Sequence, residues 1–434
     1  MDEWERWERR VQTAAHPVAY RLLGAVAARG PVVRVPGVGV VVSDARTARE
    51  VLLDTDGYTK TGPGAAGGLW TPVLGPRALI NMEGPEHAEL RRRLGGLFTP
   101  GHVAAVCEGV LRAPLGGLER RLAAGGEVDL VRVVRDGATE VVRELVGLRD
   151  AEADFAGAAA VVAGLRLWRP SLTGRQVRSA RSALARIGEA AVAAWRAGDE
   201  STVAGRLRAL GLDEAEVRGA VGVFLLTGTE TLVSFVPRLV ALAHDTGRGP
   251  DRITDALVEE ALRVTSPTPV MLRSAARAGR IGGVRVAAGE RVVIATLLCT
   301  RAYGPFAPDR ATASAGRPDA ACPGRPGGPP DPAHPADTAS VTDARTTAQG
   351  AEAGCPARPA GPPDAADRAD PAALRRLWFG AGPHFCLGMP LAMAEVRAVV
   401  AALRGFPGLR VTGRRPARGV LIPAYARLSL RAGG

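Results

Sequence analysis

The sequence predicts a mainly α fold that also contains small β-sheets (α+β). From about residue 87 to 264, apolar residues recur at a spacing of three to four, the period of an amphipathic helix. Two stretches are rich in β-branched residues instead: residues 32–44, around a Pro36-Gly37 turn, and residues 284–299. With 46% hydrophobic residues, the chain of 434 residues can build a sizeable core, as one large domain or as two to three ordinary ones.

One helical stretch carries polar residues in its middle. It opens at Asp213 with Glu216 three residues on, a capping-box arrangement, and its apolar run is broken by residues 227–231, Thr-Gly-Thr-Glu-Thr. Gly228 costs a helix about 1 kcal/mol relative to alanine, and threonine hydroxyls bond back to the preceding turn. We expect a bend there that leaves a groove for a small ligand. Glu230 and Thr231 supply an ionisable group and a hydroxyl, which together could relay protons. A polar seam against another helix is the alternative.

Residues 311–372 have a different composition from the rest. They consist mostly of Ala, Pro, Gly, Asp, Arg and Thr, with no aromatic residue and one large aliphatic residue, Val341. Such a segment cannot bury enough apolar surface to offset its ordering entropy, so we predict a disordered insertion. Cys322 and Cys355 lie inside it, either without a function or as a redox pair or metal site. The ordered domain would then comprise residues 1–310 and 373–434.

Charge and cysteine usage exclude several protein classes. The net charge of +12 comes from arginines spread along the chain, and no basic cluster is interleaved with aromatic residues, so we expect no nucleic-acid partner. The sequence contains no run of about 20 apolar residues, so we expect no membrane span. The N-terminus is charged from its second residue and lacks the core of a signal peptide, which favours the cytoplasm. Five scattered cysteines without a CxxC pair argue against a disulfide framework and a structural zinc site.

Four weak signals accompany a glycine-rich cysteine loop, FGAGPHFCLGMP, residues 379–390. Cys386 in this loop can be an inert thiol, a nucleophile or a metal ligand. The other signals, each uninformative alone, are the helical pair Glu260 and Arg263, the cationic face of His87 and Arg91, Arg273 at the start of an extended segment, and the threonine-rich helix described above.

Together, and in this order, these motifs resemble those of the cytochromes P450, the haem-thiolate monooxygenases, and most of all the soluble bacterial branch. The cysteine pattern Phe-x-x-Gly-x-x-x-Cys-x-Gly is matched by Phe379, Gly382, Cys386 and Gly388. Glu-x-x-Arg is matched by Glu260 and Arg263. The oxygen-binding helix signature is matched by Gly228, Glu230 and Thr231, and the His-x-x-x-Arg helix ending in Phe-x-Pro by His87, Arg91, Phe98 and Pro100.

The resemblance implies a cytochrome P450 fold that holds haem b, with the Cys386 thiolate as the axial iron ligand. Gly380, Gly382 and Gly388 would let the backbone wrap beneath the porphyrin and aim N–H groups at the sulfur, while Phe379 would help to exclude water. It also implies haem-propionate partners, namely His384, Arg273, His87 and Arg91. Glu260 and Arg263 would form a buried structural pair, and Glu230, Thr231 and Gly228 would serve oxygen and proton delivery.

The implied function is a monooxygenase that inserts one atom of O2 into a small apolar organic substrate of secondary metabolism. Electrons would come from an acidic ferredoxin and its ferredoxin reductase, and the protein would act as a cytoplasmic monomer. Oxidative coupling of aromatic rings and a haem-binding sensor without turnover are the alternatives. The chain departs from the family pattern at Leu232, where relatives have a second threonine, at Ala311, and in a short stretch between His244 and Glu259.

Overall fold

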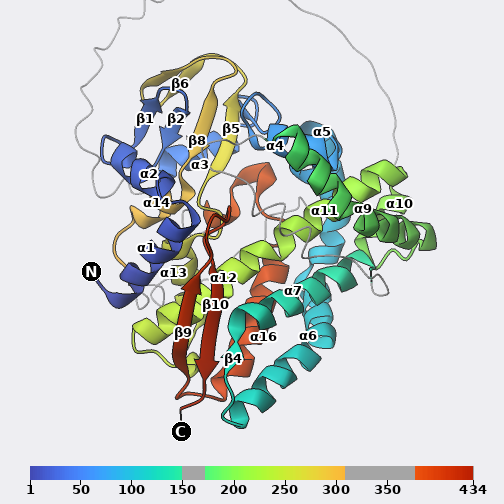
Figure 1. Ribbon diagram of the computed structural model, residues 1–434. Helices are drawn as coiled ribbons and strands as arrows, with labels where there is room; N and C mark the ends of the chain where they lie inside the picture. The colour runs from blue at the N-terminus through green and yellow to red at the C-terminus, as the bar shows by residue number, and fades with distance from the viewer. Residues whose placement is uncertain (149–171, 308–376, 434) are drawn as a thin grey trace, which may run out of the picture.

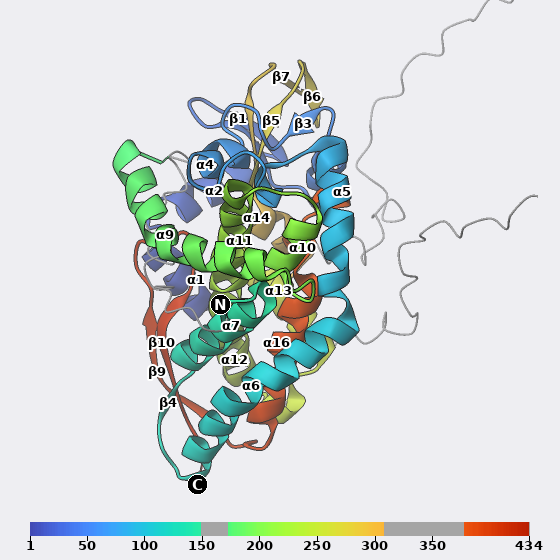
Figure 2. The same cartoon turned by 90° about the vertical axis from the view of Figure 1, so that its right-hand side faces the viewer.

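The computed structural model is mostly helical, with its sheets at the edge of a helical body (Figures 1 and 2). It describes residues 1–148, 172–307 and 377–433. The α-helices are α1 (Glu3–Ala15), α2 (Ala19–Ala27), α3 (Ala45–Leu53), α4 (Ala66–Leu74), α5 (Gly84–Leu94), α6 (Pro100–Ala123), α7 (Leu130–Val146), α9 (Gly174–Ala197), α10 (Val203–Ala209), α11 (Glu214–Gly228), α12 (Glu230–Asp245), α13 (Asp255–Thr265), α14 (Thr296–Arg301) and α16 (Met389–Arg404).

Short 3-10 turns connect several of these helices, and the strands in the described residues form three sheets. The turns are η1 (Leu79–Asn81), η2 (Gly95–Phe98), η3 (Pro250–Arg252), η6 (Leu377–Phe379) and η7 (Gly382–His384). The largest sheet has the order β1-β2-β8-β5-β3, the second β4-β10-β9 and the third β6-β7. The strands are β1 (Val32–Val35), β2 (Gly39–Val42), β3 (Tyr58–Thr59), β4 (Val128–Asp129), β5 (Met271–Ala275), β6 (Gly279–Ile281), β7 (Val284–Val286), β8 (Arg291–Ile294), β9 (Arg410–Pro416) and β10 (Tyr425–Arg431).

The core of the body is the helix α12, which packs against α7, α13 and α16. Every residue of α12 from Leu232 to Ala243 is buried, and the helix crosses the centre of the molecule (Figure 1). By length and composition, the stretch Glu214–Asp245 is apolar enough to cross a membrane, but most of it is buried inside the protein. Its hydrophobicity is therefore explained by its place in the core.

The predicted fold class is confirmed, with one correction at the end of a predicted strand region. The strands β1 and β2 pair antiparallel around the Pro36-Gly37 turn, and the Asp213–Glu216 capping box starts α11. Within residues 284–299, β7 and β8 end at Ile294, and residues from Thr296 onward form α14 instead. There the Thr300 hydroxyl donates to the carbonyl of Thr296, so local hydrogen bonding favours a helical turn over β-propensity.

A glycine allows α4 to lie directly on α11, the helix that leads into the polar break. A Cβ at Gly219 would lie 1.9 Å from the carbonyl oxygen of Leu74, the last residue of α4. No other residue type fits there without moving one helix, because a backbone atom cannot yield as a side chain does. The apolar loop that precedes the His87 helix is thereby held against α11.

Two expectations concern parts of the chain that the structure does not describe. The predicted insertion at residues 311–372, with Cys322 and Cys355, lies outside the described residues. The cysteines that are described, Cys107, Cys299 and Cys386, are free thiols. Between α12 and α13, where the sequence is short, the turn η3 is the element present.

Candidate functional site

The loop before α16 needs its glycines to place Cys386. Gly380 and Gly382 have φ values of +83° and +63°, which only glycine adopts without strain. A Cβ at Gly382 would also lie 2.9 Å from Leu53 Cδ2, so the loop is tight against α3. The backbone N–H of Cys386 donates to the carbonyl of Phe379 at 2.8 Å, which closes the loop onto itself.

The Cys386 sulfur lies where backbone donors converge. Burial raises the pKa of its thiol, whereas the N–H of Gly388, the guanidinium of Arg91 and the N–H of Met389 act in the opposite direction. Its side chain is nevertheless accessible, unlike those of Cys107 and Cys299, which are buried. Burial raises the pKa of the Cys107 thiol to about 12 and also raises that of Cys299. Among the described cysteines, Cys386 alone combines access with hydrogen-bond donors for a thiolate.

The four predicted propionate partners come together beside this loop. His384 is the last residue of η7, His87 and Arg91 lie on α5, and Arg273 lies on β5. The ring centroids of His87 and His384 are 4.4 Å apart. Burial, followed by the charge of Lys60, lowers the pKa of His384 to about 3 and that of His87 to about 4, so both rings are neutral at neutral pH. Burial also lowers the pKa of Arg273 to about 10.

Sequence reasoning missed a fifth member of the cluster, Lys60. Its Nζ lies 3.3 Å from Nδ1 of His384, and the residue is 8% exposed. Burial and the charge of Arg273 lower the pKa of Lys60 to about 7. The sequence does distinguish this residue, because Lys60 is its only lysine. A chain that otherwise uses arginine for every basic position keeps its one ammonium group at this site.

These five residues form a largely buried cluster of basic side chains. Within the described residues, none of Lys60, Arg91 and Arg273 forms an ion pair with an acidic side chain within 4.0 Å. The nearby acid, Glu83, accepts hydrogen bonds from the backbone N–H groups of Lys60 and Thr61. Burying cations without a partner is costly, so this cluster fits a ligand that brings carboxylates. The donor set and the accessible cysteine together fit a haem with its two propionates.

The pair Glu260 and Arg263 is present as predicted, with Nη2 of Arg263 2.6 Å from Oε1 of Glu260. The Arg263 guanidinium also donates to the carbonyls of Thr300, Gly304 and Pro305. The pair therefore fixes the segment that follows α14, and it touches no part of the cationic cluster.

The helix containing Gly228, Glu230 and Thr231 breaks where its polar residues begin. The helix α11 ends at Gly228 and α12 begins at Glu230. The predicted back-bonding is present: the hydroxyl of Thr227 donates to the carbonyl of Val223 at 2.8 Å, and that of Thr231 to the carbonyl of Thr227 at 2.9 Å. A Cβ at Gly228 would lie 2.9 Å from Val142 Cγ2, so this glycine also allows α11 to approach α7.

Glu230 has a partner that the sequence did not predict. Its carboxylate accepts a hydrogen bond from Nη1 of Arg135 on α7, and both side chains remain partly exposed. Within the described residues, no hydrogen bond joins Glu230 or Thr231 to the cysteine loop. The acid of the predicted proton relay is therefore held on the α7 side by a charge-assisted contact.

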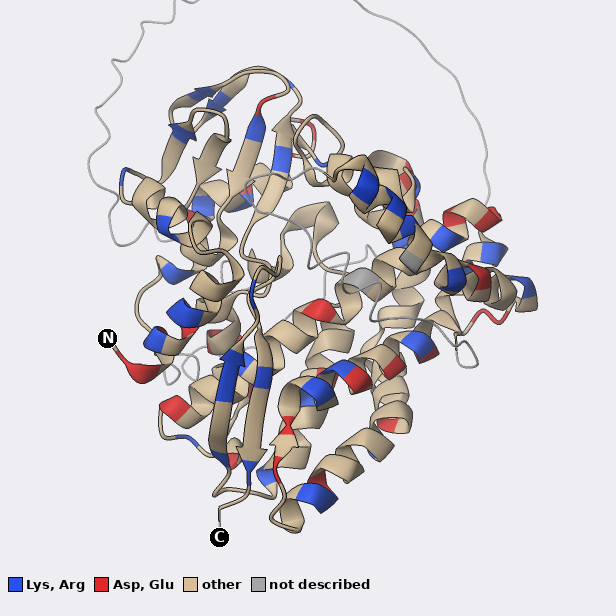
Figure 3. Cartoon of the chain, in the orientation of Figure 1, with Lys and Arg blue, Asp and Glu red and all other residues tan. Residues whose placement is uncertain are grey.

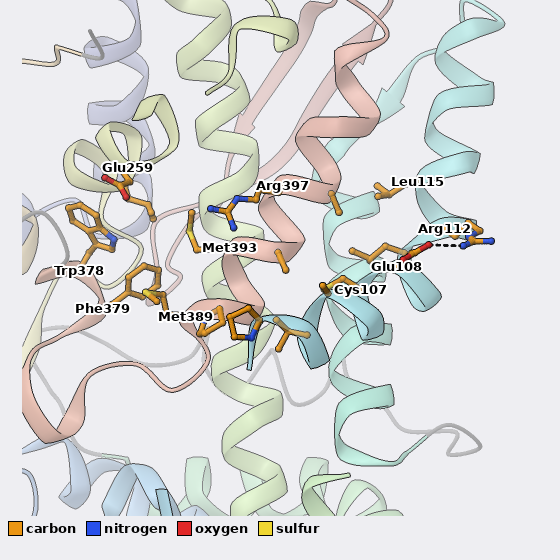
Figure 4. A pocket seen from close by; sticks show the side chains of 18 residues that line it. Cys107, Glu108, Arg112, Leu115, Glu259, Trp378, Phe379, Met389, Met393 and Arg397 are labelled. Atoms are coloured by element: carbon orange, nitrogen blue, oxygen red, sulfur yellow. Dashed lines mark hydrogen bonds and ion pairs between the residues drawn. The ribbon is translucent and has the colours of Figure 1, made fainter. Parts of the chain in front are cut away.

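A cavity of about 820 Å³ lies on the outer side of the cysteine loop, between α6, α13 and α16 (Figure 4). Phe379 and Met389, which flank the Cys386 segment, form part of its wall. Trp378 and Phe379 close one side, and the ion pair of Glu108 and Arg112 lies at the other. The cavity therefore adjoins the cysteine loop without containing any member of the cationic cluster.

No protein-family profile matches the chain. Curated relatives from Mycobacterium bovis and Mycobacterium tuberculosis carry the name "Putative cytochrome P450 140". They are 28% identical over 249 residues, which cover 50% of this chain and 53% of the relative. The chain thus spans about half the length of the curated relatives it matches.

Solved structures match over nearly the whole chain. P450 EryK in complex with erythromycin B is 22% identical with a TM-score of 0.66, and the match covers 97% of this chain and 98% of that one. P450BioI, in complex with an acyl carrier protein that carries hexadec-9Z-enoic acid, is 18% identical with a TM-score of 0.70, covering 97% and 100%. HmtN, a post-tailoring hydroxylase of himastatin biosynthesis, is 20% identical with a TM-score of 0.64, covering 96% and 98%. The chain therefore has the cytochrome P450 fold, which confirms the resemblance carried by its cysteine, histidine and arginine motifs.

Proposed function

We propose that this chain is a haem-thiolate monooxygenase that inserts one atom of O2 into a small apolar organic molecule. The observation that carries the proposal is the accessible Cys386 sulfur, which faces backbone donors beside a buried cluster of cations without acidic partners. When bound, haem b would supply the oxygen-activating chemistry, because a thiolate ligand favours O–O cleavage. Cys386 would hold the iron, and Lys60, Arg91, Arg273, His87 and His384 would hold the propionates.

The remaining residues of the proposed site handle protons and water. The Thr231 hydroxyl, now bonded to the Thr227 carbonyl, can donate into the space beside the helix break after a rotation about one bond. Glu230 would exchange protons with solvent through its partly exposed carboxylate. Its ion pair with Arg135 would have to open before the carboxylate could turn toward the site. Phe379, packed edge-on against Phe385 at 6.1 Å between ring centroids, would exclude water from the thiolate.

The substrate class and the electron donor belong to the same proposal. EryK and HmtN are named with erythromycin B and himastatin, products of secondary metabolism, and this supports an apolar secondary-metabolite substrate. Acidic and basic residues are interspersed along the described elements (Figure 3). Arg92 and Arg93 are exposed at the end of α5, the helix that also carries Arg91, and both contact Glu89. Arg375 and Arg376, expected to join them, lie outside the described residues.

The thiolate assignment is tested by Cys386→Ala. Because the strongly red-shifted CO band of a reduced haem protein requires a thiolate ligand, we expect this band to disappear in the variant. The measurement is the CO difference spectrum of the reduced protein, with Cys107→Ala and Cys299→Ala as controls that keep the band. A band that survives in Cys386→Ala and is lost in either control contradicts the assignment.

Lys60→Met tests the anion site, because it removes one charge-assisted hydrogen bond to a propionate. Such a bond contributes about 1.5–3 kcal/mol, so haem transfer to apomyoglobin should accelerate about tenfold or more. Lys60→Arg keeps the charge and should retain most of the wild-type rate, while Arg121→Met, at the exposed end of α6, serves as the control. Equal transfer rates in Lys60→Met and wild type would remove Lys60 from the haem site.

The proton role is tested by Thr231→Ala. Without the hydroxyl, haem and ligand binding should persist, but electrons should be diverted to hydrogen peroxide. The measurement is the ratio of peroxide to oxidised product with a surrogate ferredoxin, and Thr227→Ala is the matched control one turn earlier. Unchanged coupling in Thr231→Ala would refute the role, and absence of any turnover in wild type would favour the sensor alternative.

Docking of an acidic ferredoxin predicts sensitivity to salt. Attraction between charges weakens as the Debye length falls from about 10 Å at 0.1 M to about 3 Å at 1 M, so reduction of the iron should slow across a salt series. Arg93→Glu should slow it at low salt, whereas Arg121→Glu should not. If the rate of iron reduction depends neither on salt nor on Arg93→Glu, the donor docks elsewhere or is not acidic.

A further inference from the structure

The cavity between α6, α13 and α16, here called the outer cavity, has the size and the lining of a small-molecule site. Its volume of about 820 Å³ lies within the range of about 300–1,000 Å³ that is typical of ligand pockets. Leu111 and Leu262 of its lining are buried, and Trp378 and Phe379 close one side (Figure 4). A small apolar molecule would therefore bury much of its surface there.

The cations in the described lining of the outer cavity already have acidic partners. Arg112 forms an ion pair with Glu108, and these side chains are 77% and 76% exposed, so the pair lies where the cavity meets solvent. Arg397 donates to both carboxylate oxygens of Asp255, and the carboxylate of Glu259 is a further negative charge near it. A negatively charged ligand would therefore find no unpaired cation among these residues.

One polar group in the wall of the outer cavity has no partner. Trp378 is 4% exposed, and its indole Nε1 forms no hydrogen bond within the part of the chain that the structure describes. In Figure 4, the nitrogen edge of its ring faces the cavity. An indole N–H only donates, and a buried donor without an acceptor is destabilising. The missing partner is therefore an acceptor inside the cavity.

We propose that the outer cavity is a binding site of its own for an uncharged apolar molecule, whose carbonyl oxygen accepts a hydrogen bond from the indole N–H of Trp378. A neutral carbonyl fits better than a carboxylate, because burying a charge against apolar walls without a free cation is costly. The site is separate from the one proposed for oxygen chemistry, since neither Thr231 nor any of the five basic residues beside the cysteine loop belongs to its described lining.

The test uses benzophenone, an apolar ketone that on irradiation forms covalent bonds with C–H groups beside it, above all those of methionine side chains. The chain has five methionines, of which Met389 and Met393 line the outer cavity. The purified full-length protein is irradiated at increasing benzophenone concentrations, and the adducts are located by peptide mass spectrometry. We expect saturable labelling at Met389 or Met393. Labelling confined to the other methionines, or no labelling at all, overturns the proposal.

Trp378→Phe keeps an aromatic ring and removes the N–H. The dissociation constant of benzophenone, read from the concentration dependence of labelling, should then rise about threefold or more, because one neutral hydrogen bond is lost. Diphenylmethane has the same two rings without the carbonyl. Its constant, measured by competition with the labelling, should change less than twofold. Trp195→Phe removes another indole N–H without a described partner, on α9, and should leave both constants unchanged.

Ala398→Leu provides a second test that leaves Trp378 in place. It adds bulk to the α16 wall of the outer cavity and should therefore weaken the binding of both compounds. Unchanged labelling in Ala398→Leu would place the probe outside this cavity and contradict the proposal. Carbonyl recognition by Trp378 is wrong if Trp378→Phe leaves the benzophenone constant unchanged or weakens both compounds equally.

Discussion

Unmatched positive charge beside the cysteine loop is the constraint on which the site depends. Lys60, Arg91 and Arg273 come from three separate segments, and no acidic side chain pairs with them in the described chain. Glu83 is occupied by backbone N–H groups, and both nearby histidines are neutral at neutral pH because their pKa values are lowered. An anion bound there would stabilise the cluster and would thereby contribute to the stability of the fold.

The use of lysine at this one position has a chemical reason. An arginine stays charged even when buried, whereas the pKa of Lys60 falls to about 7, so this residue can enter the site partly neutral. Arg91 and Arg273 already contribute two guanidinium groups to the cluster, and a third would add a positive charge that cannot be removed by deprotonation. One compact ammonium beside His384 lowers the cost of building the site before its anion arrives.

The sequence predicts features that depend on neighbouring residues, and it misses contacts between residues that are far apart along the chain. Capping at Asp213 and the Gly380 and Gly382 turns depend on neighbouring residues, and the sequence predicted the helix and the loop correctly. Lys60 and Arg135 were missed because their partners, His384 and Glu230, are 324 and 95 residues away. The start of α14 was missed because β-branched composition outweighed a single threonine hydroxyl bond in the prediction. Pairings made by tertiary structure leave no periodic trace in the sequence.

A second buried polar network, around Arg238 of α12, is connected to the cationic cluster through one short segment. Arg238 is 2% exposed, and its Nε and Nη2 donate to the two carboxylate oxygens of Glu8 on α1. Arg238 donates to the carbonyl of Thr265, the last residue of α13, at 2.6 Å. The next residue, Ser266, has a φ of +32°, a conformation that costs free energy in a residue other than glycine and persists only where its surroundings enforce it. The chain then extends into β5, which carries Arg273. The network around Arg238, which also binds the carbonyl of Pro423 in the turn between β9 and β10, thus lies directly before the strand that carries Arg273.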